Sequence, residues 1–202
     1  MSDMSKPNAR ERILQTAYEL FTQRGVRDVP VDEIIRRSGV AIATFYRHFR
    51  SKDELVTAFL SRREQLWTSD SVVSAARERG SDPVAKLLAI FDVFDEWFHR
   101  ENFEGDSFVN VLIEMGANHP LGKASIGHLA NVRKNLEELA IEAGLREPKE
   151  FAFSYQILMK GSIIEATMGD LNSAKRAQHM AASLIKDFQV ADETGDAEGA
   201  TA

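Results

Sequence analysis

The stretch GVAIATFYRHFRSKDEL, residues 39–55, is the most informative part of the chain for its fold. Its glycine closes one short helical segment, and Ile42 to His48 predicts a second short helix only a few residues later. Two short helices joined by a tight turn that contains glycine indicate a helix-turn-helix unit. Ser51 and Glu54 then have the spacing of a capping box, which predicts a long helix that begins at Ser51 and continues to about Ala76.

The residues before this stretch predict the first two helices of the unit. The first begins at Asn8, which has Glu11 three residues later as in a capping box, and ends near Gly25. Its apolar face is formed by Ile13, Leu14, Ala17, Leu20 and Phe21. A short helix from Val31 to Arg37 follows Pro30, whose missing N–H costs nothing at the start of a helix.

The rest of the chain also has helical periodicity, without the sustained alternation that predicts a strand. Further helices are predicted near residues 82–100, 106–117, 120–143, 148–169 and 172–190, several of them with a proline near the start. We therefore predict an all-α fold of about nine helices. In it, the long helix from Ser51 joins an N-terminal helix-turn-helix domain to a larger helical domain.

The composition is that of a soluble globular protein, with 44% hydrophobic and 28% charged residues in a chain of 202. The chain has no cysteine, which excludes disulfides and thiolate metal sites and fits a reducing cytoplasm. No apolar run approaches the ~20 residues of a membrane span, and the first ten residues lack the apolar segment of a secretory signal. We expect a cytoplasmic protein that does not contact a membrane.

The net charge of −6 is spread unevenly. Residues 1–52 contain ten Lys and Arg against six Asp and Glu, whereas residues 53–202 contain fifteen against twenty-five. A basic N-terminal quarter on an acidic body indicates that an anionic partner contacts the first part only. The alternative interpretation is chance clustering of charges on a solvated surface.

The third helix has the chemistry of a binding surface. Val40, Phe45 and Phe49 have the spacing to pack inward onto the first helix. The other side chains lie outward or at the edges: Ala41, Ile42, Ala43, Thr44, Tyr46, Arg47 and His48. This helix contains no carboxylate to orient His48 and no serine or cysteine nucleophile, so the residues are unsuited to catalysis.

The same residue types suit nucleic acid. Hydroxyl groups, an imidazole ring and the Lys52 ammonium can all bond to phosphate oxygens, and Lys52 lies beside a helix N-terminus that itself favours phosphate. Small apolar residues at the front of the helix permit a close approach to the major groove and contact with thymine methyl groups. The alternative is that Tyr46 and His48 are ordinary surface residues of a three-helix bundle.

The segment ILQTAYELFTQRGVRDVPVDEIIRRSGVAIATFYRHFRSKDEL resembles the DNA-binding region of TetR-type transcriptional regulators over about residues 10–56. The resemblance implies a homodimer that places the third helix of each subunit in the major groove of a palindromic operator in double-stranded DNA. By position, phosphate contacts are implied for Thr44, Tyr46, His48 and Lys52, and groove contacts for Ala41, Ile42 and Ala43. Arg47 and DNA shape are the expected additions to base readout. Val29 and Pro30 depart from the family, which commonly has Thr or Ser there.

The resemblance also implies the organisation of the chain. Residues 9–54 are expected to form the DNA-binding domain and residues 55–190 the ligand-binding and dimerisation domain. Residues 1–8 and the acidic residues 191–202 are expected to be disordered. The implied function is a repressor that is released by a small, largely apolar effector of unknown identity.

The sequence has two alternative interpretations of function. A helical DNA- or ligand-binding module without promoter regulation is the main alternative. An enzyme in the helical body is disfavoured because no acid, base or nucleophile constellation is present. We expect no cofactor and no metal site, since the histidines lie apart and lack the spacing of metal ligands.

The helix predicted near residues 148–169 is apolar on two sides, which indicates burial on both. One side carries Phe151, Tyr155, Leu158, Ser162 and Glu165, and the other carries Phe153, Ile157, Gly161, Ile164 and Met168. With the following helix, it predicts a four-helix bundle across a two-fold axis. The predicted interface residues are Tyr155, Leu158, Ser162, Ala177, Ala181, Leu184 and Phe188. The alternative is that both helices pack only within one chain.

Aromatic residues are concentrated in the middle of the chain, and some of them are candidates to line an effector pocket. These candidates are Trp67, Phe94, Trp97, Phe108, Leu112, Met115 and Met159. Glu114, His128 or Ser162 is a candidate to orient a ligand. The alternative is core packing for the apolar residues and capping or surface roles for the polar ones.

Overall fold

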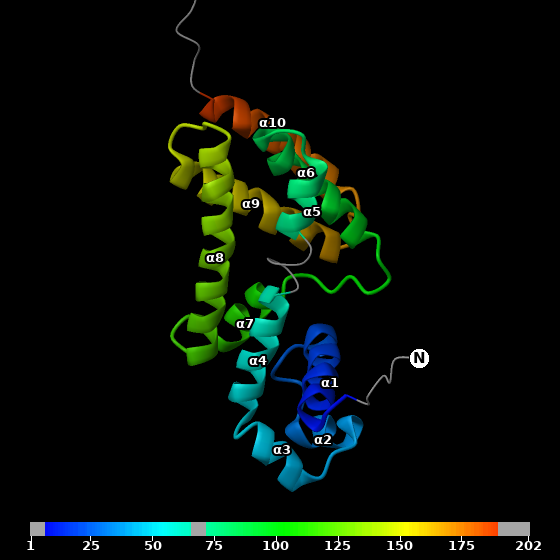
Figure 1. Cartoon of the computed structure of the whole chain (residues 1–202). Coiled ribbons are helices and arrows are strands. Elements are labelled where there is room, and N and C mark those ends of the chain that lie inside the picture. The colour runs from blue at the N-terminus through cyan, green and yellow to red at the C-terminus, as the bar shows by residue number, and fades with distance from the viewer. Residues whose placement is uncertain (1–6, 66–71, 190–202) are drawn as a thin grey trace, which may run out of the picture.

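The computed structural model describes residues 7–65 and 72–189, which form ten α-helices and no strand (Figure 1). The helices are α1 (Ala9–Arg24), α2 (Val31–Ser38), α3 (Ile42–His48), α4 (Lys52–Glu64), α5 (Val72–Arg79), α6 (Pro83–Phe98), α7 (Ser107–Met115), α8 (Pro120–Glu142), α9 (Pro148–Thr167) and α10 (Ser173–Phe188). The all-α prediction is confirmed.

Residues 1–6 of the predicted N-terminal arm and the predicted tail at 191–202 lie outside the described residues. Within residues 7–65 and 72–189, none of the helices combines the length and hydropathy needed to cross a membrane.

The first helices begin and end where their sequence indicates. The side chain of Asn8 accepts a hydrogen bond from the Glu11 N–H at 2.9 Å and so caps α1. α2 starts directly after Pro30 and ends at Gly39, whose φ of 65° is the left-handed conformation that favours glycine. α3 then begins only three residues after Gly39, which confirms the tight connection of the helix-turn-helix.

The capping box at the start of α4 is present with one change. Ser51 Oγ accepts a hydrogen bond from the Glu54 N–H at 3.1 Å. The Glu54 carboxylate in turn accepts from the Arg50 N–H at 2.8 Å, one residue before the position that the motif predicts. Both bonds satisfy backbone donors where α3 ends and α4 begins, so the two helices meet at a defined angle.

The single long helix predicted from Ser51 to about Ala76 is replaced by two helices, α4 and α5, which is why the described chain has ten helices and not nine. Residues 66–71 between them lie outside the described residues. α4 packs against α1, α7 and α8, whereas α5 packs along α6. The two helices therefore belong to different parts of the molecule.

The buried apolar side chains form two clusters. The N-terminal cluster contains the buried residues of α1–α4 and of the α1–α2 connection, together with Phe108 and Val111 of α7 and Leu121 of α8. The body cluster contains the buried residues of α5, α6, α9, α10 and the C-terminal half of α8. The N-terminal cluster thus crosses residue 54, and the domain division predicted at that residue stays a prediction. α8 contributes residues to both clusters, and in Figure 1 it runs from the level of α7 to the far end of the body.

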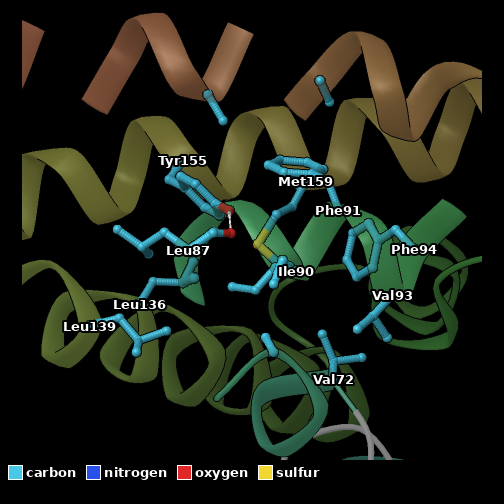
Figure 2. Packing of buried hydrophobic residues seen from close by; sticks show 14 of the residues in the cluster. Val72, Leu87, Ile90, Phe91, Val93, Phe94, Leu136, Leu139, Tyr155 and Met159 are labelled. Carbon is cyan, nitrogen blue, oxygen red and sulfur yellow. Dashed lines mark hydrogen bonds between the residues drawn. The ribbon is translucent and has the colours of Figure 1, made fainter. Parts of the chain in front are cut away.

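The centre of the body cluster is Tyr155 on α9, which is fully buried (Figure 2). Its ring lies 5.3 Å from that of Phe91 and 5.4 Å from that of Phe151, and its hydroxyl donates a hydrogen bond to the Leu87 carbonyl of α6. Burial raises the pKa of the Tyr155 hydroxyl well above its usual value, with a smaller effect from Asp92. The neutral hydroxyl therefore acts as a specific link between α6 and α9.

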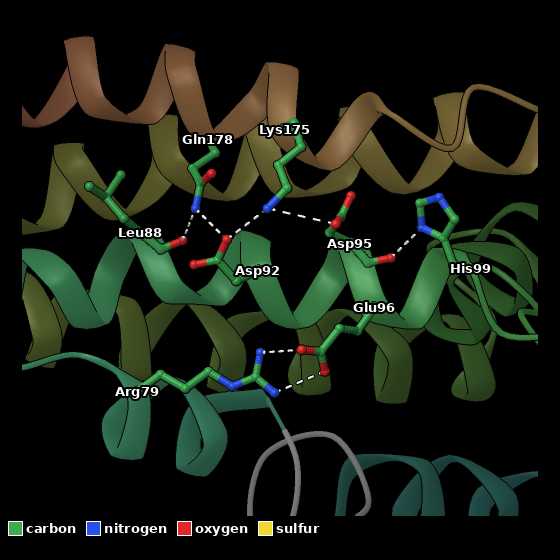
Figure 3. A network of polar contacts seen from close by, with 8 residues as sticks. All are labelled: Arg79, Leu88, Asp92, Asp95, Glu96, His99, Lys175 and Gln178. Atoms are coloured by element: carbon green, nitrogen blue, oxygen red, sulfur yellow. Dashed lines mark hydrogen bonds and ion pairs between the residues drawn. The ribbon is translucent and has the colours of Figure 1, made fainter.

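A polar network covers the outer edge of this core (Figure 3). Asp92 on α6 accepts hydrogen bonds from Lys175 and Gln178 of α10, both at 2.9 Å. Arg79 of α5 forms two hydrogen bonds to the Glu96 carboxylate of α6, at 2.8 and 2.9 Å. These exposed pairs fix the register of α5 and α10 on α6 more than they add stability.

We expect Tyr155→Phe to destabilise the protein by about 1 kcal/mol, because it removes one buried hydrogen bond while it keeps the aromatic packing. The measurement is urea denaturation followed by circular dichroism. Tyr46→Phe is the matched control, since Tyr46 is exposed, and should change the free energy of unfolding by less than about 0.5 kcal/mol. Equal stability of the two variants would contradict the role of the Tyr155 hydroxyl.

Candidate nucleic-acid interface

α3 is held in place by two phenylalanines on one side of the helix. Phe45 is fully buried and Phe49, at the helix end, is nearly so, and their ring centroids are 6.2 Å apart. The Arg10 guanidinium of α1 lies over the Phe49 ring at 5.2 Å. Because these contacts fix the rotation of α3, the opposite face of the helix is presented to solvent.

The N-terminal part of this outer face is small and apolar. Ala41, Ile42 and Ala43 are all exposed, and Ile42 keeps 63% of its surface in contact with solvent. α3 begins at Ile42, and its N-cap residue Ala41 makes no side-chain cap hydrogen bond to the first turn. Small and apolar side chains of this kind can approach base edges closely and contact thymine methyl groups.

The C-terminal part of the outer face is polar and partly ordered by packing. Tyr46 is exposed, and its ring meets the buried Phe45 ring edge-on at 5.3 Å. Arg47 is exposed, while Thr44 and His48 are partly buried at the edges of the helix. The structure therefore places Ile42, Ala43, Tyr46 and Arg47 on the solvent side of α3, with Ala41 exposed just before the helix and Thr44 and His48 at its edges.

Lys52 lies at the first position of α4, next to this face, and is partly buried. Burial lowers the pKa of its ammonium group, and the carboxylates of Glu114, Asp53 and Asp28 act in the opposite direction. The ammonium group thus lies at the junction of α3 and α4, within the electrostatic field of three carboxylates. Phosphate would meet both this cation and the N-terminus of α4.

The predicted dimer residues lie in or against the core of their own chain. Tyr155, Ser162, Ala177 and Ala181 are buried in the chain's own core. The other three predicted residues, Leu158, Leu184 and Phe188, pack against the body cluster. These seven side chains thus contact the core of their own chain, and their part in a dimer interface stays a prediction. Helical periodicity identified two apolar sides of α9, but it could not tell which side faces the core of the same chain.

The second apolar side of α9 is the exposed one. It consists of Phe153, Ile157, Gly161, Ile164 and Met168, and Ile157 is 71% and Met168 69% exposed. Met180 of α10 is also exposed, and it lines a groove of about 460 Å³ between α9 and α10 together with Ile157 and Gly161. Except for Met168, these exposed residues lie one or two positions along the sequence from a predicted interface residue.

The structure divides the seven predicted effector contacts among separate places. Phe94 and Met159 lie in the body cluster, whereas Phe108 lies in the N-terminal cluster and Met115 packs against it. Leu112 is partly buried, and Trp67 lies outside the described residues. Trp97 lines a cavity of about 540 Å³ together with Tyr18, Arg63 and Glu104. No group of three or more His, Asp or Glu side chains suited to a metal ion occurs in the part of the chain that the structure describes.

The three polar candidates each have a partner within the chain. His128 Nδ1 lies 2.6 Å from the Glu64 carboxylate, and Ser162 Oγ donates to the backbone carbonyl of its own helix one turn earlier at 2.8 Å. The Glu114 carboxylate accepts hydrogen bonds from the backbone of the α1–α2 turn. A sequence pattern could not have indicated this last contact, because its partners are 87 and 88 residues away and are backbone groups.

Comparisons with known proteins agree with this geometry. The family model of bacterial regulatory proteins of the tetR family matches residues 13–59, which cover α1–α3 and most of α4. The crystal structure of SCO4454, a TetR-family transcriptional regulator from Streptomyces coelicolor, superposes with a TM-score of 0.82 at 25% identity and covers 89% of each chain. The likeness thus extends from the DNA-binding helices through the body.

Curated relatives point the same way. The uncharacterized HTH-type transcriptional regulator TtgW of Pseudomonas putida is 35% identical over 107 residues, which are 53% of this chain and 74% of TtgW. The HTH-type transcriptional regulator SrpR of Pseudomonas putida is also 35% identical over 107 residues, 53% of this chain but only 46% of SrpR. The matched region therefore spans about half the length of SrpR and about three quarters of TtgW. The chain belongs to the TetR family of bacterial transcriptional regulators.

Proposed function

We propose that this chain is a homodimeric repressor that binds a palindromic operator through α3 of each subunit and is released by a small, largely apolar effector. The observation that carries the proposal is the outer face of α3, with an exposed apolar front and a polar flank on a helix whose rotation is fixed by Phe45 and Phe49. The exposed side chains of this face are not needed for packing within the chain. Their size and chemistry suit the major groove of DNA.

Each part of the α3 face has a role in this proposal. Ala41, Ile42 and Ala43 enter the groove, and Arg47 adds a donor for base edges or for a narrow groove. The hydroxyls of Thr44 and Tyr46, the His48 ring and the Lys52 ammonium contact phosphate and set the register. The excess of basic over acidic residues in the first 52 positions supplies the long-range attraction to DNA.

The proposed dimer forms through the exposed side of α9 and the neighbouring surface of α10. Ile157, Ile164 and Met168 would otherwise leave a contiguous apolar surface in water, which is unusual for a monomer. Gly161 lies in the middle of this surface, and an added Cβ there would meet nothing within 4 Å, so a second helix can approach closely. A two-fold axis through this face brings together two α9–α10 pairs as a four-helix bundle.

The proposed response to an effector follows from linkage. An effector releases the operator only if it binds better to a conformation in which the two α3 helices have the wrong separation. The structural route from the body to α3 is short, because α4 packs both against α1 of the DNA-binding unit, α1–α3, and against α7 and α8 of the rest of the chain. The alternative function is a helical module that binds DNA or a ligand without controlling a promoter.

The first prediction concerns the operator. Duplexes selected by the protein from a random pool should contain two inverted half-sites about one helical turn apart, roughly 34–36 Å, or a variant of this spacing. DNase footprinting at moderate salt should then protect both half-sites, and a reporter driven by a promoter that overlaps the site should be repressed. A folded dimer that selects no palindrome would sink the proposal, and an increase in reporter transcription would refute repression.

The second prediction concerns the phosphate contacts. Lys52→Ala should weaken binding to the selected duplex by roughly fivefold and reduce the slope of log affinity against log salt by about one unit. Tyr46→Phe should also weaken binding, because it removes only the hydroxyl and keeps the ring against Phe45. Lys134→Ala, at an exposed position on α8, is the matched control. Fluorescence anisotropy over a salt series measures all three, and unchanged affinity of both interface variants would remove these residues from the interface.

The third prediction concerns the dimer. Ile157→Asp should convert the protein to a monomer at micromolar concentration, because two unpaired carboxylates would be buried at the two-fold axis. Ile42→Asp is the matched control, since Ile42 is comparably exposed but lies on α3. It should remain a dimer and lose DNA binding. Analytical ultracentrifugation decides the matter, and a dimeric Ile157→Asp variant would show that another face forms the interface.

A further inference from the structure

The turn between α1 and α2 is held by a side chain that is distant in sequence. The carboxylate of Glu114, the penultimate residue of α7, accepts hydrogen bonds from the backbone N–H groups of Val26 and Arg27. The Glu114 Oε2 distances are 2.8 Å to Val26 N and 3.0 Å to Arg27 N, and Oε1 lies 3.2 Å from Val26 N. Hydrogen bonds from backbone N–H groups to a carboxylate are stronger than those between neutral groups.

Gly25 gives independent support for this contact. Its φ of 79° is a conformation that residues with side chains rarely adopt. A Cβ at this position would also lie 2.2 Å from Glu114 Oε1, well inside contact distance. The turn therefore has both the backbone shape and the open space that allow the carboxylate to reach its two donors.

α7 connects this turn to the body. At its C-terminal end Glu114 binds the α1–α2 turn, while at its N-terminal end Asp106 caps the helix through the N–H groups of Phe108 and Val109. The same Asp106 carboxylate pairs with Lys160 of α9 at 2.5 Å, and both side chains are largely buried. One nine-residue helix thus has a charged contact to α9 at one end and a charged contact to the DNA-binding unit at the other.

We infer that Glu114 is a positioning residue for DNA recognition, which holds α1–α3 at one orientation relative to the body and passes displacements of α7 to the α1–α2 turn. The inference rests on the proposed function of α3 in DNA binding. α2 begins only a few residues after the turn and α3 follows α2 directly, so a shift of Val26 and Arg27 moves the recognition face. The hydrophobic contacts of Phe108 and Val111 keep α7 on the N-terminal cluster, but contacts of this kind are non-directional. The carboxylate adds the directional element.

The contact itself is tested in the free protein, without DNA. Glu114→Gln keeps the shape of the side chain but leaves one acceptor oxygen and no charge, and Glu114→Ala removes the acceptor. Both variants should exchange the amide hydrogens of a peptide covering residues 22–29 about tenfold faster than the wild type in hydrogen–deuterium exchange. Glu138→Gln, at an exposed position on α8, is the matched control and should leave this peptide unchanged. Wild-type exchange rates in both Glu114 variants would overturn the inference.

The positioning role is tested with a duplex selected from a random pool by the wild-type protein. In the wild type, this duplex should slow amide exchange in α7, residues 107–115, although α7 is on the far side of the DNA-binding unit from α3. Glu114→Gln should lose most of this effect while it still binds the duplex at saturating concentration. Asp53→Asn controls for charge, because it removes another carboxylate near Lys52 but neither of the hydrogen-bond acceptors of the Val26 and Arg27 N–H groups.

The outcomes separate the two proposals. If the wild type selects no duplex, the proposed function fails, and the exchange rates of residues 22–29 still decide whether Glu114 holds the turn. If the wild type binds DNA and α7 responds equally in Glu114→Gln, or does not respond at all, Glu114 has no positioning role. If Asp53→Asn loses the response as fully as Glu114→Gln, local charge near Lys52 accounts for it and the inference is wrong.

Discussion

The packing of α3 against α1 through Phe45 and Phe49 is the constraint on which the rest of the interface depends. A seven-residue helix has little stability of its own, so its rotation must come from tertiary contacts. Because both rings are buried, the rotation of α3 is fixed, and with it the direction in which each neighbouring side chain points. The apolar front and the polar flank of α3 are therefore consequences of where two aromatic side chains lie.

The N-terminal cluster, to which Phe45 and Phe49 belong, also explains how the DNA-binding unit, α1–α3, can be coupled to the body. Phe108 and Val111 of α7 and Leu121 of α8 are buried in it, so these helices are part of the core that supports α3. The unit is consequently not attached through α4 alone. Apolar packing holds the parts together, and the hydrogen bonds of Glu114 to the α1–α2 turn give this junction a defined geometry.

Much of the fold could be predicted because its signals are local. The caps at Asn8 and Ser51, the glycine at the end of α2 and the prolines at the starts of α6, α8 and α9 act within one turn of helix. The orientation of the α3 side chains followed from the same short-range periodicity. The prediction of one helix from Ser51 to Ala76 was wrong because partners elsewhere in the fold, α6 for α5 and α1 for α4, divide this segment. The predicted effector contacts were scattered for a similar reason, since an aromatic side chain has the same sequence pattern in a core as in a pocket.

Apart from the division between α4 and α5, the amino-acid sequence by itself determined the helices, the helix-turn-helix and the family, because each rests on residue types at fixed short spacings. Only the tertiary structure decided which apolar side of α9 is buried, with Tyr155 inside and Ile157 in solvent, because both sides have the same periodicity. It alone also decided that Glu114 reaches the backbone of Val26 and Arg27. Backbone donors carry no residue signature, so a contact to them becomes visible only when the chain is folded.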